Sequence, residues 1–185
     1  MAMPPVRRVA HNITGGCGQV NALRRALISD LRTVAPSHCV FRTNTSCQPD
    51  EYIAHRIGLI PFEQHKGVDK VARMTVSGRD AFTSDFVVDG DGDGPEPIHG
   101  NVLIMPLGPD QKIDVTVHFA EGTGAQHAQY SKTVAVGMTM LDATTHELAF
   151  ETIFGDHMAC LSEAIDSLEA RLVSARKLAL GVCQN

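Results

Sequence analysis

The segment from residue 156 to residue 180 constrains the fold more than any other part of the sequence, because its apolar residues alternate at spacings of three and four. They form what we call the seam: Met158, Leu161, Ile165, Leu168, Leu172, Ala175 and Ala179. This spacing is typical of a helix that packs along another helix. Asp156 is the predicted cap, and acidic residues come early in the segment while basic ones come late, as the helix dipole favours.

A second amphipathic helix is predicted near the N-terminus, in GQVNALRRALISDL. Val20, Leu23, Leu27 and Leu31 recur at helical spacing, and Arg25, Ser29 and Arg32 gather on another side. We expect one face in the core and another free for a partner. A strand is predicted before this helix, from residue 5 to residue 14, and Gly15, Gly16 and Gly18 break it.

The middle of the chain favours strands. A strand is predicted at 38–43, and a helix begins after Pro49 and stops at Gly58. From Glu63 to about Tyr130 the short runs ARMTVSG, SDFVV, NVLIMPL and KIDVTVHF alternate with turn residues, and a further strand is predicted at 147–154. The pattern predicts an α+β fold with a β-rich insertion.

Composition excludes several classes of protein. Of the 185 residues, 43% are hydrophobic and 20% charged, as in an ordinary globular protein. No apolar run approaches the roughly 20 residues of a membrane helix, and the start of the chain lacks the apolar core of a signal peptide. We therefore expect an intracellular protein without a membrane partner. The net charge of -5 predicts that any link to nucleic acid is indirect.

Two short patterns admit a binding role and a structural one. Asp89, Asp91, Asp93 and Gly94 match the first half of a calcium loop, but Gly100 stands where the closing glutamate belongs, which favours a solvated loop. The glycine cluster could cradle a phosphate at the helix N-terminus. Because no GK[ST] follows it and the dinucleotide spacing is absent, a tight turn is the favoured interpretation.

No pattern predicts a metal, a cofactor or catalysis. The five cysteines are scattered without a CxxC pair. The nine histidines form no HExxH zinc motif, and no serine lies in a GxSxG nucleophile motif. His118 and His127 flank a predicted turn, and their sequence positions give no reason to expect them in one metal site. Arg24 and Arg25 are more informative, because two adjacent guanidinium groups are costly to bury without partners. By themselves they favour a solvated helix face.

Linked motifs resemble the alpha-like subunits of multisubunit DNA-directed RNA polymerase, a family that comprises bacterial alpha, its archaeal counterpart and the third-largest eukaryotic subunit. The run NALRRALISDL is similar to the NALRR helix of that family. It is followed, as in the family, by a strand ending in NTS and by a helix of the form hRlGliP that contains DE. The matching positions are Asn21 to Arg25, Asn44 to Ser46, Asp50, Glu51 and His55 to Pro61.

A second block, LGPDQKIDVTVHFAEGTGAQHAQYSKT, is similar to a segment of the archaeal and eukaryotic branch. Its matching positions are Gln111, Gly122, Gly124, His127, Ala128 and Ser131. Two departures stand out. The chain lacks the cysteine clusters that bind zinc or an iron–sulfur cluster in many relatives, and Gln129 and Tyr130 replace a basic residue and a tryptophan. The compact, divergent chain suits a viral or otherwise unusual polymerase.

The resemblance implies a dimerisation domain, with helices on an antiparallel sheet, from residues 1–62 and 136–185, and a β-rich insert from 63–135. It implies a non-catalytic assembly subunit that pairs with a smaller alpha-like subunit and contacts the largest and second-largest subunits, of which the largest carries the catalytic aspartates and magnesium. The site residues it implies at subunit interfaces are Asn21, Leu23, Arg24, Arg25, Leu27, Asn44, Thr45, Ser46, Asp50, Glu51, His55, Arg56, His127, Leu161, Ile165, Leu168 and Leu172.

Alternatives remain at this point. A free-standing homodimeric binding module could reuse the same fold, and a small enzyme for a phosphate ligand could be built on the glycine turn. Nucleus, cytoplasm and virion all remain open as locations. The sequence does not identify the source, the small partner or any regulator of the insert.

Overall fold

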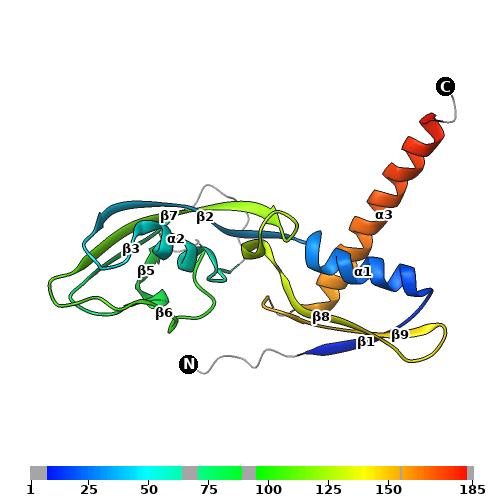
Figure 1. Cartoon of the computed structure of the whole chain (residues 1–185), viewed down its shortest axis with the longest axis horizontal. Helices are drawn as coiled ribbons and strands as arrows, with labels where there is room; N and C mark the ends of the chain where they lie inside the picture. Colours follow the sequence, from blue (N-terminus) through cyan, green and yellow to red (C-terminus); the bar gives the residue numbers. More distant parts are fainter. Residues whose placement is uncertain (1–7, 64–70, 89–94, 155, 183–185) are drawn as a thin grey trace. The chain divides into compact units, whose positions relative to one another are not determined.

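The computed structural model describes residues 8–63, 71–88, 95–154 and 156–182, which form two compact units (Figure 1). The helical unit contains the described residues within 4–32, 123–127 and 131–185. The strand-rich unit contains those within 33–122 and 128–130. The fold is mixed α/β with antiparallel sheets, as predicted at the level of fold class.

The helical unit is built on a three-stranded antiparallel sheet in the order β1-β9-β8. The strands are β1 (Val9–Thr14), β8 (Thr133–Met140) and β9 (Thr145–Thr152). The helices α1 (Cys17–Ser29) and α3 (His157–Val182) lie on the same side of this sheet (Figure 1). Their contact with the sheet buries a core of Leu23, Ala26, Leu27, Leu31, Leu148, Phe150, Cys160 and Ala164.

Local interactions set the starts of both helices. Gly16 is the N-cap of α1, and its backbone N–H donates to Gln19 Oε1 at 3.0 Å. At α3 the predicted cap is confirmed, because Asp156 Oδ1 accepts a hydrogen bond from the Ala159 backbone N–H at 3.0 Å. Such caps satisfy N–H groups that have no partner within the helix.

The strand-rich unit holds a four-stranded sheet in the order β2-β7-β3-β5 and a two-stranded sheet of β4 and β6. Helix α2 (Asp50–Gly58) and two 3₁₀ turns, η1 (Thr83–Asp85) and η2 (Ala128–Tyr130), complete it. Phe62 is 1% exposed in the centre of the core and packs edge-on against Phe86 and Phe119. The strands are β2 (Arg32–Asn44), β3 (Val71–Ser77), β4 (Ala81–Phe82), β5 (Phe86–Val88), β6 (Leu103–Met105) and β7 (Lys112–Thr123).

Most elements lie near the positions that the sequence predicts, with differences in some strands and bounds. The strand predicted at 147–154 runs from Thr145 to Thr152. Two strands are not predicted from the sequence: the short β4, and β8, although Val134, Val136, Met138 and Met140 alternate there with small or polar residues. In the structure a bulge lies between Val134 and Gly137. The predicted strand in SDFVV begins only at Phe86, because Ser84 and Asp85 form a 3₁₀ turn. The strand predicted at 38–43 is longer, from Arg32 to Asn44. Asp89, Asp91, Asp93 and Gly94 lie outside the described residues.

The compact units separate at Thr33, so residues 33–62 fold with the strand-rich unit. The division that the resemblance implies, a dimerisation domain of residues 1–62 and 136–185 and a β-rich insert of residues 63–135, stays a prediction. Among the described residues, none of the helices combines the length and the apolar character that crossing a membrane needs.

Position 124, in the second block of family-like residues, has no room for a side chain. A Cβ on Gly124 would lie 2.2 Å from the Ile28 carbonyl oxygen at the end of α1. The neighbouring Ala125 N–H donates to the Ser29 carbonyl at 3.0 Å, which fixes the loop against the helix. Backbone therefore meets backbone where no side chain fits.

We expect Gly124→Ala to lower the free energy of unfolding by about 1–3 kcal/mol, the usual cost of forcing an extra methyl group into a packed site. Urea unfolding of the full chain, followed by circular dichroism, measures the change. Gly18→Ala is the matched control, because a Cβ there meets no atom within 4 Å. Gly18 lies in the first turn of α1, and alanine favours a helix over glycine by up to about 1 kcal/mol, so this variant should be as stable as the parent chain or more stable. Equal stability of both variants would contradict the close approach.

Candidate functional site

Helix α1 presents its two arginines differently. Leu23 and Leu27 are 7% and 0% exposed and belong to the core. Arg24 is half-buried, and its Nε donates to Asn21 Oδ1 at 3.0 Å. Arg25 is exposed, and within the described part of the chain its guanidinium has no hydrogen-bond or ion-pair partner. Arg25 is thus the residue of the NALRR run that is available to another molecule.

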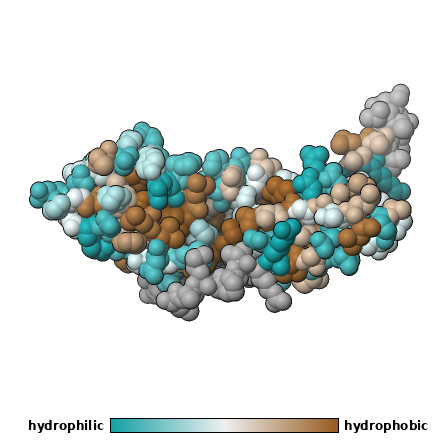
Figure 2. Space-filling view, turned by 60° about the horizontal axis from the view of Figure 1, so that its bottom comes forward, coloured by the Kyte–Doolittle hydropathy of each residue, from teal (hydrophilic) through white to brown (hydrophobic). Residues whose placement is uncertain are grey.

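Helix α3 packs on the unit with its first half alone. Cys160 and Ala164 are 1% and 0% exposed, and Leu161 and Leu168 pack beside the core. Every residue from 171 to 179 is exposed. Figure 2 shows apolar residues among polar ones on the surface toward the C-terminal end of this helix. The large apolar residues left exposed on the described part of α3 are Met158, Ile165, Leu172, Val173 and Leu178.

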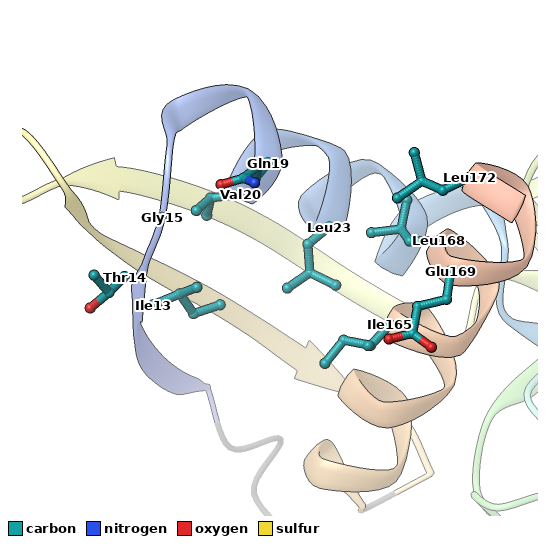
Figure 3. Close-up of a pocket in the computed structure, with 10 residues that line it drawn as sticks. All are labelled: Ile13, Thr14, Gly15, Gln19, Val20, Leu23, Ile165, Leu168, Glu169 and Leu172. Atoms are coloured by element: carbon teal, nitrogen blue, oxygen red, sulfur yellow. The ribbon is translucent and has the colours of Figure 1, made fainter. Parts of the chain in front are cut away.

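A hollow of about 200 Å³ lies between the end of β1, the start of α1 and the middle of α3, and we call it the groove (Figure 3). Its volume is below the roughly 300–1,000 Å³ of typical small-molecule pockets. It suits inserted side chains of a partner better than a free ligand. The groove is lined by Ile13, Thr14, Gly15, Gln19, Val20, Leu23, Ile165, Leu168, Glu169 and Leu172.

Two ionic contacts hold α3 in place. Asp30, just past the end of α1, accepts hydrogen bonds from Arg171 at 2.7 Å and Ser167 at 3.2 Å. Glu163 accepts from Lys132 Nζ at 2.6 Å and from the Arg32 backbone N–H at 2.9 Å. Both carboxylates join α3 to other parts of the same unit, and they set the position of the seam.

The pKa of Asp30 reflects these contacts. Partial burial of the carboxyl raises its pKa, but hydrogen bonds from Ser29, Arg171 and Ser167 together outweigh that effect and leave the pKa below its ordinary value. The ionised form is therefore the one that the folded unit stabilises.

In the strand-rich unit, the NTS residues hold a turn together. The Asn44 side-chain amide donates to the Gln48 carbonyl at 2.9 Å and to Asp50 Oδ1 at 2.7 Å, while its Oδ1 accepts from Ser46. Thr45 Oγ1 accepts from the Lys112 backbone N–H at 2.7 Å. These contacts fix the connection between β2 and α2, so the residues have a structural role whatever else they contact.

The outer face of α2 is open. Tyr52 is 45% exposed, and the exposed Arg56 lies over its ring at 6.0 Å from the centroid. Arg56 Nη2 also donates to the Leu103 carbonyl at 2.8 Å. His55 and Glu51 are exposed on the same helix. An aromatic ring held against an arginine is a composition that protein interfaces favour.

The phosphate-binding alternative for the glycine turn is disfavoured by its geometry. The Gly15 N–H donates to the Thr144 carbonyl at 2.8 Å, and the Gly16 N–H donates to Gln19. Both backbone donors already have acceptors within the protein, so they are not free to cradle an anion.

Two observations on the described residues bear on thiol and metal chemistry. Burial raises the pKa of the Cys39 thiol to about 11, which keeps it protonated at neutral pH. His38 and His118 lie with ring centroids 5.9 Å apart. No group of three or more histidine, cysteine or acidic side chains is arranged to hold a metal in the part of the chain that the structure describes.

His127 and the seam complete the positions that the resemblance implies. His127 is exposed in the loop that Gly124 fixes, and its backbone N–H donates to the Thr123 carbonyl at 3.4 Å. Leu161, Ile165, Leu168 and Leu172 lie along one side of α3 and, except for Leu161, line the groove. Sequence reasoning missed Ile13, Gln19 and Glu169, because the groove forms only when β1, α1 and α3 meet. Only the helical spacing of Ile165, Leu168 and Leu172 hinted at it.

Comparison with known proteins identifies the relatives of this chain. It is 29% identical to DNA-directed RNA polymerase subunit Rpo3 of Methanocaldococcus jannaschii, over 83% of this chain and 81% of that protein. It is 26% identical to DNA-directed RNA polymerases I and III subunit RPAC1 of Mus musculus, over 86% of this chain and 58% of the relative. It is 31% identical to Rpo3 of Natronomonas pharaonis, over 63% of this chain and 49% of the relative.

The resemblance seen in the sequence is therefore confirmed, since homologues at 26–31% identity are Rpo3 and RPAC1 subunits. The chain spans about half the length of the Natronomonas relative and 58% of the mouse one. No family model matches it.

The lowered pKa of Asp30 gives a pH-dependent prediction. A carboxylate with a depressed pKa stabilises the fold above its unfolded pKa of about 3.9 and loses that effect as the pH falls through the folded value. Asp30→Asn should cost about 1 kcal/mol at pH 7, a modest figure because Arg171 is largely exposed.

Urea unfolding of the full chain between pH 7 and pH 3 tests this. The stability gap between the parent and Asp30→Asn should narrow below about pH 4. Asp166→Asn, on the exposed side of α3, should show no such gap. A gap that is constant with pH would assign the loss to packing and not to the charge.

Proposed function

We propose that this homologue of the Rpo3 and RPAC1 polymerase subunits is a non-catalytic assembly subunit of a DNA-directed RNA polymerase. It pairs with a smaller alpha-like subunit through α1 and α3 of the helical unit and helps to seat the two large subunits. Contact with nucleic acid is only indirect. The observation that carries the proposal is the homology over most of the chain, including 81% of one archaeal Rpo3.

The helical unit supports pairing through α3. Five large apolar side chains of α3 are exposed, although α1 and the sheet already bury its first half. Exposed apolar surface next to a groove is characteristic of protein interaction sites. A helix laid along the seam would bury Ile165, Leu168 and Leu172 by ridges-into-grooves packing.

The same unit offers a second surface through Arg25. This guanidinium is charged at any physiological pH and presents several donors in a fixed plane, so it suits carboxylate or carbonyl acceptors on a protein. We assign it to the contact with the second-largest subunit, with Arg24 positioned beside it by Asn21. Tyr52, His55 and Arg56 on α2 provide a further assembly surface in the strand-rich unit.

The direct test is purification of the chain from its native source at moderate salt, followed by mass spectrometry. Two very large subunits and a small alpha-like subunit should co-purify. A lone chain or a homodimer would favour the free-standing binding module in place of the polymerase subunit. The cellular location, whether nucleus, cytoplasm or virion, follows from the complex that is recovered.

Leu172→Glu tests the seam. Leu172 is 69% exposed, so the substitution should change the stability of the chain by less than about 0.5 kcal/mol. It should weaken binding of the small subunit about 100-fold or more, because a charge would face an apolar partner. Biolayer interferometry with the small subunit measures the change. Val87→Glu, at a site 67% exposed in the strand-rich unit, is the control and should bind normally.

Arg25→Glu separates the two surfaces. Pairing with the small subunit should be unchanged, whereas recruitment of the second-largest subunit should fall at least tenfold, about 1.4 kcal/mol. A quantitative pull-down with reconstituted subunits measures pairing with the small subunit and recruitment of the second-largest subunit. The control Arg42→Glu reverses the charge of another exposed arginine, in the strand-rich unit, and should leave pairing and recruitment unchanged. Normal recruitment by the Arg25 variant would remove the role assigned to this arginine.

A further inference from the structure

The wall of the groove carries one ionisable side chain, that of Glu169. The other lining residues are apolar or neutral, and five of them are Ile13, Leu23, Ile165, Leu168 and Leu172. Figure 3 shows the Glu169 carboxylate beside Ile165, on the stretch of α3 that faces β1 and α1. A charged group therefore lies within an otherwise uncharged and mainly apolar surface.

Glu169 differs from the other acidic residues that line the junction of α1 and α3. Asp30 is paired with Arg171, and Glu163 with Lys132. The residues three and four positions from Glu169 along the helix are Ile165, Asp166, Leu172 and Val173, so its own helix supplies no cation at those positions. Within the described part of the chain, no ion pair compensates the charge of Glu169.

Covering this groove with a wholly apolar partner is unfavourable. The carboxylate would lose water without gaining a hydrogen bond, and an uncompensated charge at a buried site is strongly destabilising. A lysine or arginine avoids this penalty, because its aliphatic stem can lie along Ile165 and Leu172 while its charged end reaches Glu169. The groove therefore selects for the charge of its occupant as well as for its shape.

We propose that the groove receives a helix of the small alpha-like subunit that places a lysine or arginine against Glu169, so that Glu169 is the specificity-determining residue of the pairing. This rests on the function proposed above. The α3 seam supports a helical occupant, since Ile165, Leu168 and Leu172 form a ridge at helical spacing. The volume of the groove suits one or two side chains of such a helix.

This chain shows how an alpha-like helix could supply the cation. Arg176 lies two turns beyond Glu169 on nearly the same side of α3. If the closing helix of the partner runs antiparallel to α3 and carries a basic residue at a similar place, that residue meets Glu169. A second copy of this chain could offer Arg176 itself, which makes the homodimer the competing outcome.

The test compares Glu169→Gln, Glu169→Lys and the control Asp166→Lys, an exposed site on α3 outside the groove lining. The probe is the small subunit that co-purifies with the parent chain. We expect binding to weaken about tenfold for Glu169→Gln and about 100-fold for Glu169→Lys, and to change less than about twofold for the control. The salt dependence of binding should be flatter for Glu169→Gln.

Charge exchange completes the test. Each basic residue on the closing helix of the small subunit is changed to glutamate in turn, and one of these changes should restore binding to the Glu169→Lys chain. Normal binding by Glu169→Gln, or no rescue by any partner change, would overturn the proposal. A homodimer that Glu169→Lys breaks and Arg176→Glu restores would replace the small subunit with a second copy.

Failure of the proposed function gives a different result. In that case the parent chain itself recovers neither a small alpha-like subunit nor the large subunits. If the parent chain recovers them but the Glu169 variants bind equally well, only the role of Glu169 is lost.

Discussion

The packing of Cys160 and Ala164 against the helical unit is the contact on which the rest of this surface depends. Both side chains are small and fully buried, so the start of α3 can approach the sheet and α1 closely. Asp30 and Glu163 then fix the direction in which the helix leaves the core. Every residue from 171 to 179 is exposed as a consequence. The half of α3 that folding leaves uncovered is the half available for assembly.

The sequence could predict what depends on local pattern. The presence of α1, the bounds of α2 and the Asp156 cap follow from apolar spacing, Pro49 and the acidic first turn of α2. The end of α1 was predicted too late, because α1 ends at Ser29, before Leu31 and Arg32. The alternation of Val134, Val136, Met138 and Met140 is typical of a strand, so β8 could have been predicted. Its bulge and the positive φ of 53° at Ala135 could not, because no glycine or turn residue stands at position 135. The groove could not be predicted from the sequence either. Its lining comes from β1, α1 and α3, and only the three-dimensional fold brings Ile13 next to Ile165.

The family-like residues divide into those that build the fold and those that face outward. Leu23, Leu27, Asn44 and Ser46 are occupied within their own unit, the leucines by burial and the others by hydrogen bonds. Gly124 is required by the close approach of two backbones. A sequence motif therefore mixes both kinds of residue. Burial and hydrogen bonding separate them, and by this criterion Arg25 and the exposed part of the seam are the better interface candidates.

The exposure of apolar seam residues to water is unfavourable, and this favours the association of α3 with a partner. Leu172 and Leu178 are 69% and 72% exposed on α3, and a helix gains stability in a protein mainly by burying its apolar side. Glu169, within the same surface, opposes indiscriminate association because an apolar partner cannot compensate its charge. Apolar area thus supplies the driving force, and one carboxylate restricts which partner can use it.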